Sequence, residues 1–301
     1  MHMLVSSTSA RGRAISVGHS VIRALRAGGW KVTVTVTTPE DDPREVAAHS
    51  EAPLVAALGG DGYISAVAEG TYRSKKVLVP FPGGRGNDLC RALGVGANPV
   101  RRAQELAYLG LHDEQTSKEL GSRIQPIDAL WVTDSTQMRR LVLGVVSLGY
   151  EALANEHANA SWFRSGLMAY AYGAVSALFS YKPRTFNIEV DGIAMELSGW
   201  VVSVSNSGYV GSGIRLVPDS RLDDGVVELM HVGPVPARSV VPAIFQILVE
   251  RNAEHPLITV HRAHTITLTE PQGCTAWADG DPIASIPLTL NVEKNALSTL
   301  I

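Results

Sequence analysis

Apolar and polar positions follow two different patterns along this 301-residue chain, and the change falls near Gly121. Before Gly121, short apolar runs alternate with segments in which apolar side chains recur at helical spacing, as they do across residues 15–27. This alternation predicts strands at 3–6, 31–37, 54–58 and 77–81, and helices at 15–27, 43–49, 64–70 and 89–93. Repeated strand–helix units indicate a parallel sheet with helices on both faces.

Strand patterns dominate after Gly121. Predicted strands lie at 127–133, 140–147, 185–190, 195–205, 225–232, 265–269, 274–277 and 288–292, and helical stretches at 151–181 and 236–251 interrupt them. Asp191-Gly192, between two of the strands, is typical of a tight hairpin turn. We therefore expect a Rossmann-like α/β domain over 1–122, followed by a mostly antiparallel β-sandwich domain over 123–301 whose last residues can pack back on the first domain.

Composition restricts the class of protein and its partners. Hydrophobic residues make up 45% of the chain and charged residues 18%, as in globular proteins. The net charge of −3 argues against a nucleic-acid partner, because such proteins carry a basic excess. The two cysteines, Cys90 and Cys274, form no Cys-x-x-Cys pair, which predicts buried thiols in a reducing cytoplasm. The most apolar long stretch, 166–181, is short for a membrane span.

Two glycine-rich loops follow the apolar runs at 54–58 and 77–81. They read Gly59-Gly60-Asp61-Gly62 and Pro82-Gly83-Gly84-Arg85-Gly86-Asn87-Asp88. A strand that ends in glycines and opens a helix directs backbone N–H groups and a positive helix end at one point, which suits a phosphate. Ligands of parallel sheets bind at the carboxyl ends of the strands, so two such loops predict a site for a triphosphate tail. Each loop alone is also compatible with an ordinary turn, and neither fits the two commonest phosphate-loop patterns.

Several motifs, in order, resemble the signatures of the diacylglycerol-kinase catalytic-domain family, the bacterial lipid kinases related to sphingosine and ceramide kinases. They are the two glycine loops, the second continuing to Gly94, and Pro126-Ile127-Asp128, Val217-Pro218-Asp219 with Leu222-Asp223-Asp224-Gly225, and Asp279-Gly280-Asp281. The resemblance covers nearly the whole chain. It implies an α/β nucleotide domain followed by a β-rich domain, with ATP and the lipid bound in the cleft between them.

The resemblance also implies nucleotide contacts. In the first loop, the amides of Gly59, Gly60 and Gly62 would surround the ATP phosphates, and Asp61 would stand near Mg²⁺ and the reacting phosphate. A turn aspartate that bonds to its own backbone is the alternative for Asp61. In the second loop, Gly84 and Gly86 would allow close approach of the nucleotide, while Asn87 and Asp88 would cap the following helix and shape the site. Ser9, Arg11 and Thr37 match further phosphate or nucleotide contacts, with Thr38 as an alternative to Thr37.

The chain departs from the family pattern at several of these contacts. The first strand ends in Ser6-Ser7-Thr8-Ser9-Ala10-Arg11, where relatives have Asn-Pro-x-Ser-Gly-Lys/Arg. Tyr63 replaces a threonine, Ser65-Ala66 replaces Asn-Glu, and Arg85 replaces a hydroxyl residue. An arginine at position 85 can still hold a phosphate through charge-assisted hydrogen bonds. These departures concern the nucleotide contacts first and catalytic activity second.

Carboxylates near the C-terminus complete the expected chemistry. Asp281 matches the general base of bacterial relatives, although they commonly carry a glutamate there, and Asp61 is the second candidate. An ordinary Asp-Gly-Asp turn is the alternative. Asp224 resembles the side-chain ligand of a structural Mg²⁺ site, which the backbone carbonyls of Arg221 and Val226 would complete, and a plain turn between strands is the alternative there.

The sequence as a whole predicts a cytoplasmic lipid kinase that uses ATP and Mg²⁺ to phosphorylate the hydroxyl of diacylglycerol or a related lipid, giving phosphatidic acid. A lipid substrate implies docking on a membrane surface, to which Trp162 and Phe163 are candidates to contribute, with core packing as their alternative role. An exposed edge of the β-rich domain would permit a homodimer. The alternatives are a kinase of a soluble metabolite, such as NAD kinase, and a catalytically degenerate protein that only binds lipid or nucleotide.

Overall fold

The computed structural model describes residues 1–111, 113–163, 165–178, 180–215, 217–250 and 256–301, which form two units. Unit 1 comprises Met1–Ile127 together with Asn295–Ile301, and unit 2 comprises Asp128–Lys294. The sequence prediction divided the chain a few residues earlier, between residues 122 and 123. No helix within these ranges has both the length and the apolarity to cross a membrane.

Unit 1 is built on a parallel sheet with the strand order β2-β1-β3-β4-β18. Its strands are β1 (His2–Ser6), β2 (Thr33–Thr37), β3 (Leu54–Gly59), β4 (Val77–Pro82) and the end of β18 (Leu288–Leu300), where Ser298 and Thr299 pair with β4. β1, β3 and β4 are almost entirely buried, because helices cover the sheet. The predicted parallel α/β sheet is therefore confirmed.

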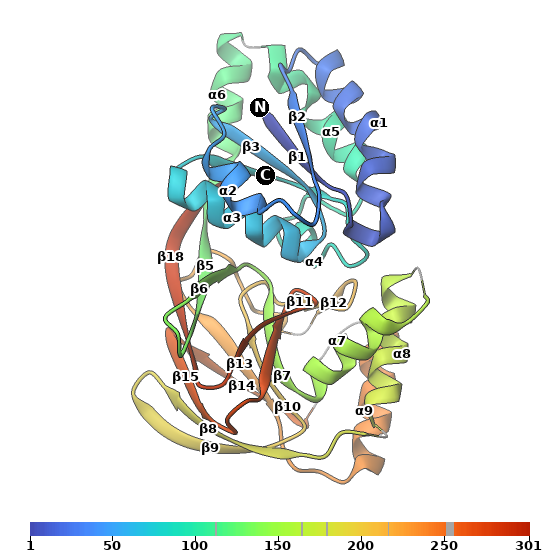
Figure 1. Cartoon of the computed structure of the whole chain (residues 1–301), viewed down its shortest axis with the longest axis vertical. Coiled ribbons are helices and arrows are strands. Elements are labelled where there is room, and N and C mark those ends of the chain that lie inside the picture. The colour runs from blue at the N-terminus through green and yellow to red at the C-terminus, as the bar shows by residue number, and fades with distance from the viewer. Residues whose placement is uncertain (112, 164, 179, 216, 251–255) are drawn as a thin grey trace. The chain divides into compact units, whose positions relative to one another are not determined.

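The helices of unit 1 are α1 (Arg13–Ala27), α2 (Pro43–Ala48), α3 (Asp61–Ser74), α4 (Asp88–Ala92), α5 (Pro99–Ala107) and α6 (Glu114–Arg123). α1 and α5 pack side by side, as α2 and α3 do (Figure 1). The apolar face of α1 buries Val21 and Leu25 against the sheet, and Gly28 follows the last helical residue, as predicted. The strand–helix pattern of the sequence did not locate α5 and α6, whose first turns are capped by Asn98 and Asp113.

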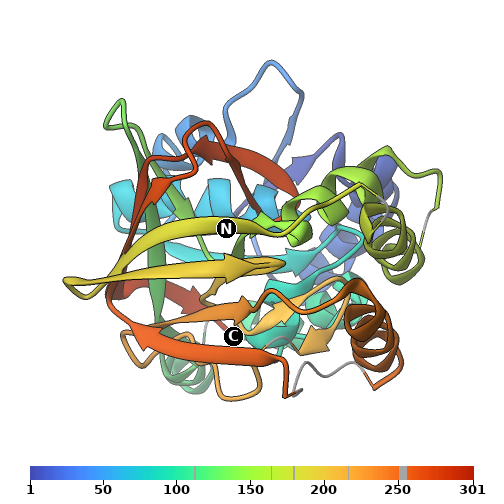
Figure 2. The ribbon, with the colours of Figure 1, turned by 90° about the horizontal axis from the view of Figure 1, so that it is seen from below.

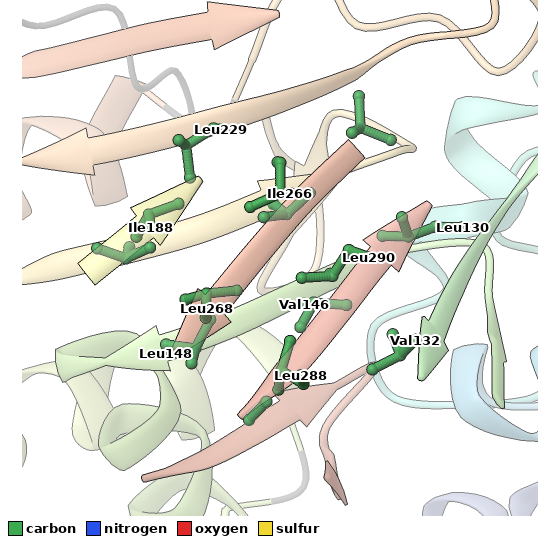
Figure 3. Close-up of a cluster of buried hydrophobic side chains, with 14 of the residues drawn as sticks. Leu130, Val132, Val146, Leu148, Ile188, Leu229, Ile266, Leu268, Leu288 and Leu290 are labelled. Atoms are coloured by element: carbon green, nitrogen blue, oxygen red, sulfur yellow. The ribbon is translucent and has the colours of Figure 1, made fainter. Parts of the chain in front are cut away.

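Unit 2 is an antiparallel sandwich. One sheet contains β8 (Arg184–Val190), β9 (Ile193–Gly199), β15 (Thr265–Glu270) and the first half of β18, with β5 (Ile124–Asp134) and β6 (Arg139–Val142) attached. The other has the order β14-β13-β10-β7-β16-β17, formed by Ile258–Ala263, Val227–Val232, Val201–Ser205, Val145–Gly149, Thr275–Ala278 and Asp281–Ser285. Apolar side chains of both sheets meet in one buried cluster, which Figure 3 shows around Leu130, Val146, Ile266 and Leu290. The predicted β-sandwich is confirmed.

Three helices of unit 2, α7 (Tyr150–Ala160), α8 (Gly166–Leu178) and α9 (Ala237–Glu250), gather at one end of the sandwich (Figure 2). The sequence predicted one helix over 151–181, but α7 and α8 are separate; residues 164 and 179 lie outside the described residues. The predicted helix 236–251 corresponds to α9, and its last residue, Arg251, also lies outside them.

Two predicted strands are each divided in the structure. The run 195–205 forms β9 and β10 in different sheets, with the break at Gly199, where an added Cβ would lie 2.0 Å from the Val232 carbonyl oxygen. The run 140–147 likewise divides into β6 and β7. The break at Gly199 depends on a close approach to distant backbone, which local periodicity does not reveal. Cys90 is buried as predicted, and burial raises the pKa of its thiol, whereas Cys274 is only half-buried.

Candidate active site

The carboxyl ends of β3 and β4 bring the two glycine loops together within unit 1. The strands are neighbours in the sheet, and Gly59 lies opposite Pro82. The Gly83 N–H donates to the Gly59 carbonyl oxygen at 2.7 Å, so the loops are hydrogen-bonded to each other where they leave the sheet. The prediction that both loops share one edge of the sheet is confirmed.

Glycine is required at the closest contact between the loops. A Cβ added to Gly84 would lie 2.5 Å from the Cα of Gly60, and one added to Gly83 would lie 2.8 Å from the backbone nitrogen of Gly59. Neither contact can be relieved by a side-chain rotation, because the opposing atoms belong to the backbone. Gly83 and Gly84 therefore allow the two strand ends to approach each other without intervening side chains.

Helix α3 starts at Asp61, directly after Gly60. The N–H groups of Asp61, Gly62 and Tyr63 therefore lie in a first turn that no carbonyl of the same helix can reach. Together with the positive end of the helix dipole, such groups favour an anion. The first loop thus has the backbone geometry expected of a phosphate site.

Asp61 ties the two loops together through its carboxylate. Its Oδ1 accepts a hydrogen bond from the Leu89 N–H at 3.0 Å, in the first turn of α4, so it caps that helix from the other loop. A Cβ on Gly86 would lie 3.1 Å from Asp61 Oδ2. Asp61 is therefore more than a turn aspartate bonded to its own backbone: the structure gives it a fixed position over the second loop.

The second loop is closed by Asn87. Its side-chain oxygen accepts from the Gly84 N–H at 2.7 Å, and its amide donates to the Gly84 carbonyl oxygen at 3.0 Å. Asn87 has a left-handed backbone and makes no side-chain cap to α4, so the prediction that it caps this helix is wrong. Asp88 pairs with Arg91, Oδ1 to Nη1, at 2.9 Å. Arg85 is half-buried between Gly84 and Gly86.

The loop after β1 reaches the same place through Ser9. Its hydroxyl oxygen accepts from the Gly60 N–H at 3.1 Å. Ala10 and Arg11 both have positive φ, and the Arg11 side chain is exposed. The structure thus brings Ser9 into contact with the first glycine loop, while Arg11 lies two residues further along the same turn.

Tyr63 occupies the space beside Gly59. A Cβ on Gly59 would lie 2.4 Å from the tyrosine ring, and the Tyr63 hydroxyl lies 2.8 Å from Thr37 Oγ1. Burial raises the pKa of Tyr63 to about 12, so its phenol stays protonated at neutral pH. The buried Thr37 hydroxyl is therefore paired with a protein group, and Thr38 bonds to Asp41 through both its N–H and its hydroxyl.

In unit 2, Asp279-Gly280-Asp281 forms the tight turn between β16 and β17. Asp279 and Gly280 both have positive φ, as a two-residue hairpin turn requires, and Asp281 pairs with Ala278. The Asn159 amide donates to the Gly280 carbonyl oxygen. The Asp281 side chain is exposed, yet the surrounding protein partly desolvates its carboxyl, which raises its pKa above the usual range. The turn therefore places the Asp281 carboxylate at the surface of unit 2.

The Asp224 carboxylate, the side-chain ligand expected for Mg²⁺, is bound by protein groups, while the Arg221 and Val226 carbonyl ligands stay predictions. Asp224 Oδ2 pairs with Arg262, and Oδ1 accepts from the Val226 N–H at 3.2 Å. Mg²⁺ and Ca²⁺ need a shell of free oxygen ligands, whereas these oxygens already bind nitrogen donors. No cluster of three or more His, Cys, Asp or Glu side chains suited to a metal occurs among the described residues.

Sequence reasoning missed an apolar pocket in unit 2. It has a volume of about 90 Å³ and lies between α8, α9 and the sheet that carries β10 and β13, with Tyr170, Ala174, Val201, Met230 and Ala243 among its lining residues. The buried Glu151 also lines it, and its Oε1 has no hydrogen-bond partner among the described residues. Burial raises the pKa of Glu151. The lining residues come from separate segments with ordinary core patterns, so no local signal reveals the pocket.

Comparisons with known proteins agree with this architecture. Residues 1–116 match the family described as "Diacylglycerol kinase catalytic domain", and residues 144–301 match the "YegS C-terminal NAD kinase beta sandwich-like domain". A diacylglycerol kinase of Mycobacterium tuberculosis is 23% identical, over 99% of this chain and 93% of its own length. A protein of Cronobacter sakazakii named "Probable lipid kinase YegS-like" is 25% identical, over 92% and 88%.

Solved structures show the same fold. A crystal structure of a diacylglycerol kinase from Bacillus anthracis superposes with a TM-score of 0.74 at 18% identity, covering 99% of this chain and 96% of that one. The two domain matches together span most of the chain. The catalytic-domain match falls in unit 1 and the C-terminal-domain match falls mainly in unit 2. The chain therefore belongs to the diacylglycerol kinase catalytic-domain family of lipid kinases, phosphotransferases that use ATP.

Proposed function

We propose that the protein phosphorylates the free hydroxyl of diacylglycerol, or of a closely related lipid, to give phosphatidic acid and ADP. The observation that carries this proposal is the pair of hydrogen-bonded glycine loops in unit 1. The first of these loops leads into α3, whose first-turn N–H groups lie beside Asp61. Relatives of nearly the same length are named diacylglycerol kinases, which supports this choice of lipid.

In this proposal, the ATP phosphates bind to the first-turn amides of α3, that of Gly62 among them. Arg11 of the loop after β1 and Arg85 of the second glycine loop are the cations. Mg²⁺ bound with ATP would neutralise phosphate charge, and the Asp61 carboxylate, which is held beside Gly86 of the second loop, would help to bind it.

Asp281 takes the role of general base. Its carboxylate accepts the proton of the lipid hydroxyl while that oxygen bonds to the γ-phosphorus, and the bond from the γ-phosphorus to the bridging oxygen breaks to release ADP. The raised pKa of Asp281 makes it a stronger base than an ordinary aspartate. Asp61 remains the second candidate for this role.

The lipid side of the site lies in unit 2. We assign the apolar pocket beneath α8 and α9 to an acyl chain, because its lining, apart from Glu151, is mainly aliphatic and aromatic. The opposite face of α8 exposes Met168, Tyr172 and Val175, at helical spacing, and Trp162 just before the helix is 78% exposed. Core packing is therefore the wrong role for Trp162. An exposed apolar face beside an apolar pocket supports docking of a cytoplasmic protein on a membrane surface.

A phosphorylation assay tests the proposed activity. We expect radiolabelled ATP to label diacylglycerol in mixed micelles, with monoacylglycerol, ceramide and sphingosine as competing acceptors. Asp281→Asn should lower kcat by about 10²–10⁴-fold, the usual contribution of a general base, and leave the KM for ATP unchanged. Because the base must be deprotonated, kcat should fall as the pH drops through the raised pKa of Asp281.

Other outcomes of this assay separate the alternatives. Labelling of NAD but of no lipid would identify a soluble-metabolite kinase. ATP binding without turnover on any acceptor would identify a degenerate site, for which the departures at Tyr63 and Arg85 would be the first explanation.

A vesicle-sedimentation experiment tests the docking surface. Trp162→Ser combined with Met168→Ser should weaken binding to diacylglycerol-containing vesicles and leave the unfolding temperature unchanged, since both side chains are exposed. Val249→Ser, at another exposed apolar position, on α9, is the matched control. Equal binding by the double variant and the control would exclude the α8 face as the docking surface.

A further inference from the structure

We propose that unit 2 uses a guanidinium, that of Arg262, in place of a structural divalent cation at the loop 221–226. Asp224, the side-chain ligand expected for such an ion, is present, but both of its carboxylate oxygens bind protein nitrogens. This inference concerns the loop alone, and it does not rest on the proposed lipid substrate.

Arg262 reaches the loop from the neighbouring strand. It lies on β14 directly opposite Glu228 of β13, and its side chain pairs with the Asp224 carboxylate, while its Nε lies 3.7 Å from Glu228 Oε1. The Glu228 side chain is only 3% exposed, and that of Asp224 is 20% exposed. One guanidinium thus contacts two carboxylates that water reaches poorly, and one of them is the carboxylate expected to bind the ion.

Other protein donors hold the backbone of the loop. The Gly225 N–H donates to the buried Asp128 Oδ2 at 2.6 Å, and His264 Nδ1 lies 2.9 Å from the Gly225 carbonyl oxygen. The Asp224 carbonyl oxygen accepts from Lys294 Nζ at 3.5 Å. The carbonyl oxygens of Asp224 and Gly225 are therefore engaged by side-chain nitrogen atoms, one of which belongs to a second cation.

A positive charge already faces these carboxylates. Asp224 and Glu228 carry two negative charges when ionised, and the Arg262 guanidinium contacts both of them. A divalent ion at this place would have to displace a hydrogen-bonded guanidinium. It follows that folding of unit 2 should not depend on divalent cations, and that any Mg²⁺ requirement of the protein arises from its nucleotide alone.

Thermal unfolding of the full chain, without nucleotide, tests this inference. The unfolding temperature of the wild type should agree within roughly 1 °C in EDTA, in MgCl₂ and in CaCl₂, and metal analysis after dialysis should find no stoichiometric cation. Arg262→Met keeps the aliphatic part of the side chain and removes the charge. It should unfold roughly 2–6 °C lower in EDTA and recover part of that loss in MgCl₂, because the carboxylates become available to the ion.

Two further variants make the test decisive. Arg221→Met removes an exposed arginine of the same loop that pairs with the half-exposed Asp223, and it should change the unfolding temperature by less than roughly 1 °C. Arg262→Lys keeps a cation, so it should remain insensitive to metal, and it replaces the Met variant if that one does not fold. A wild type that loses stability in EDTA, or an Arg262→Met variant that matches the wild type in both solutions, would overturn the inference.

Discussion

The glycine loops of unit 1 and the acidic loop 221–226 of unit 2 both carry motifs of the same kinase family, but they differ in what fixes their structure. In unit 1 the approach of two strand ends, Gly84 over Gly60, fixes the loops, and hydrogen bonds from Asn87 and Asp61 close them. In unit 2 the acidic loop is held by charged side chains from other strands, Arg262 and Lys294 among them.

This difference shows which features a family resemblance can transfer. Where two backbones approach so closely that only glycine fits, the glycine motif itself requires that approach. The same motif in a relative therefore implies the same loop geometry. A carboxylate, in contrast, is neutralised equally well by a metal ion or by a guanidinium, so its partner depends on residues elsewhere in the chain. Experiments that disturb the two loops should therefore give effects of different kinds and sizes.

The largest effect is expected from Gly84→Ala in unit 1. The added Cβ would lie 2.5 Å from the Gly60 Cα, so the two loops must separate and the amides lose their common direction. We expect ATP affinity, measured by calorimetry, to fall at least about 100-fold, or about 2.7 kcal/mol. Gly121→Ala on α6 is the control, because an added Cβ meets nothing within 4 Å there and alanine favours a helix. Unchanged ATP affinity in Gly84→Ala would show that the loops are not the nucleotide site.

A second test separates the two roles of Asp61. Asp61→Asn keeps an oxygen that accepts the Leu89 N–H but removes the charge, so we expect a nearly unchanged unfolding temperature and a loss of kinase activity of at least about 100-fold. Asp61→Ala also removes the cap of α4, which costs about 1 kcal/mol of stability. If Asp61→Asn retained full activity, the carboxylate would serve only to join the loops.

The strand–glycine–helix units of unit 1 were predictable from the sequence because each is local: an apolar run, glycines and a helical period follow one another within about 20 residues. The helix-capping role predicted for Asn87 was wrong, because the left-handed backbone at this position turns the side chain back to Gly84. Motif and spacing are the same for a cap and for a loop closure, so the sequence does not distinguish them.

In unit 2 the unpredicted features depend on residues far apart in the chain. Arg262 meets Asp224 across 38 positions, through the register of β13 and β14, and the pocket beside Glu151 is lined from several segments. Gly199 ends β9 because of a carbonyl at Val232. Strand patterns predicted the presence of a sandwich, but these contacts depend on which strands pair with each other, and the periodicity of a single strand does not identify its partner.

A smaller effect, on stability, is expected from Asp128→Ala in unit 2. Asp128 is fully buried, and its Oδ2 accepts from the Gly225 N–H at 2.6 Å, so the variant leaves a buried donor without this acceptor. Such losses cost about 1–3 kcal/mol, which should lower the unfolding temperature by roughly 2–10 °C. If the loop is held by protein groups, MgCl₂ should not restore the loss. If MgCl₂ restored the unfolding temperature of this variant, the acidic loop would bind a divalent ion, and protein groups alone would not be what holds it.

The smallest effect is expected from Glu228→Gln, and its sign depends on pH. Burial raises the pKa of Glu228, and although Arg262 opposes this, its guanidinium is exposed and lies 3.7 Å away, so burial prevails. Because the folded state favours the protonated form, the stability from Glu228 is complete below its unfolded pKa and is lost as the pH rises through the raised folded pKa. Glutamine is neutral throughout. The variant should therefore unfold at the wild-type temperature at pH 4 and roughly 1–3 °C higher at pH 8. A lower unfolding temperature at pH 8 would mean that attraction to Arg262 outweighs burial, and the acidic loop would then depend on charge pairing even more strongly than its contacts indicate.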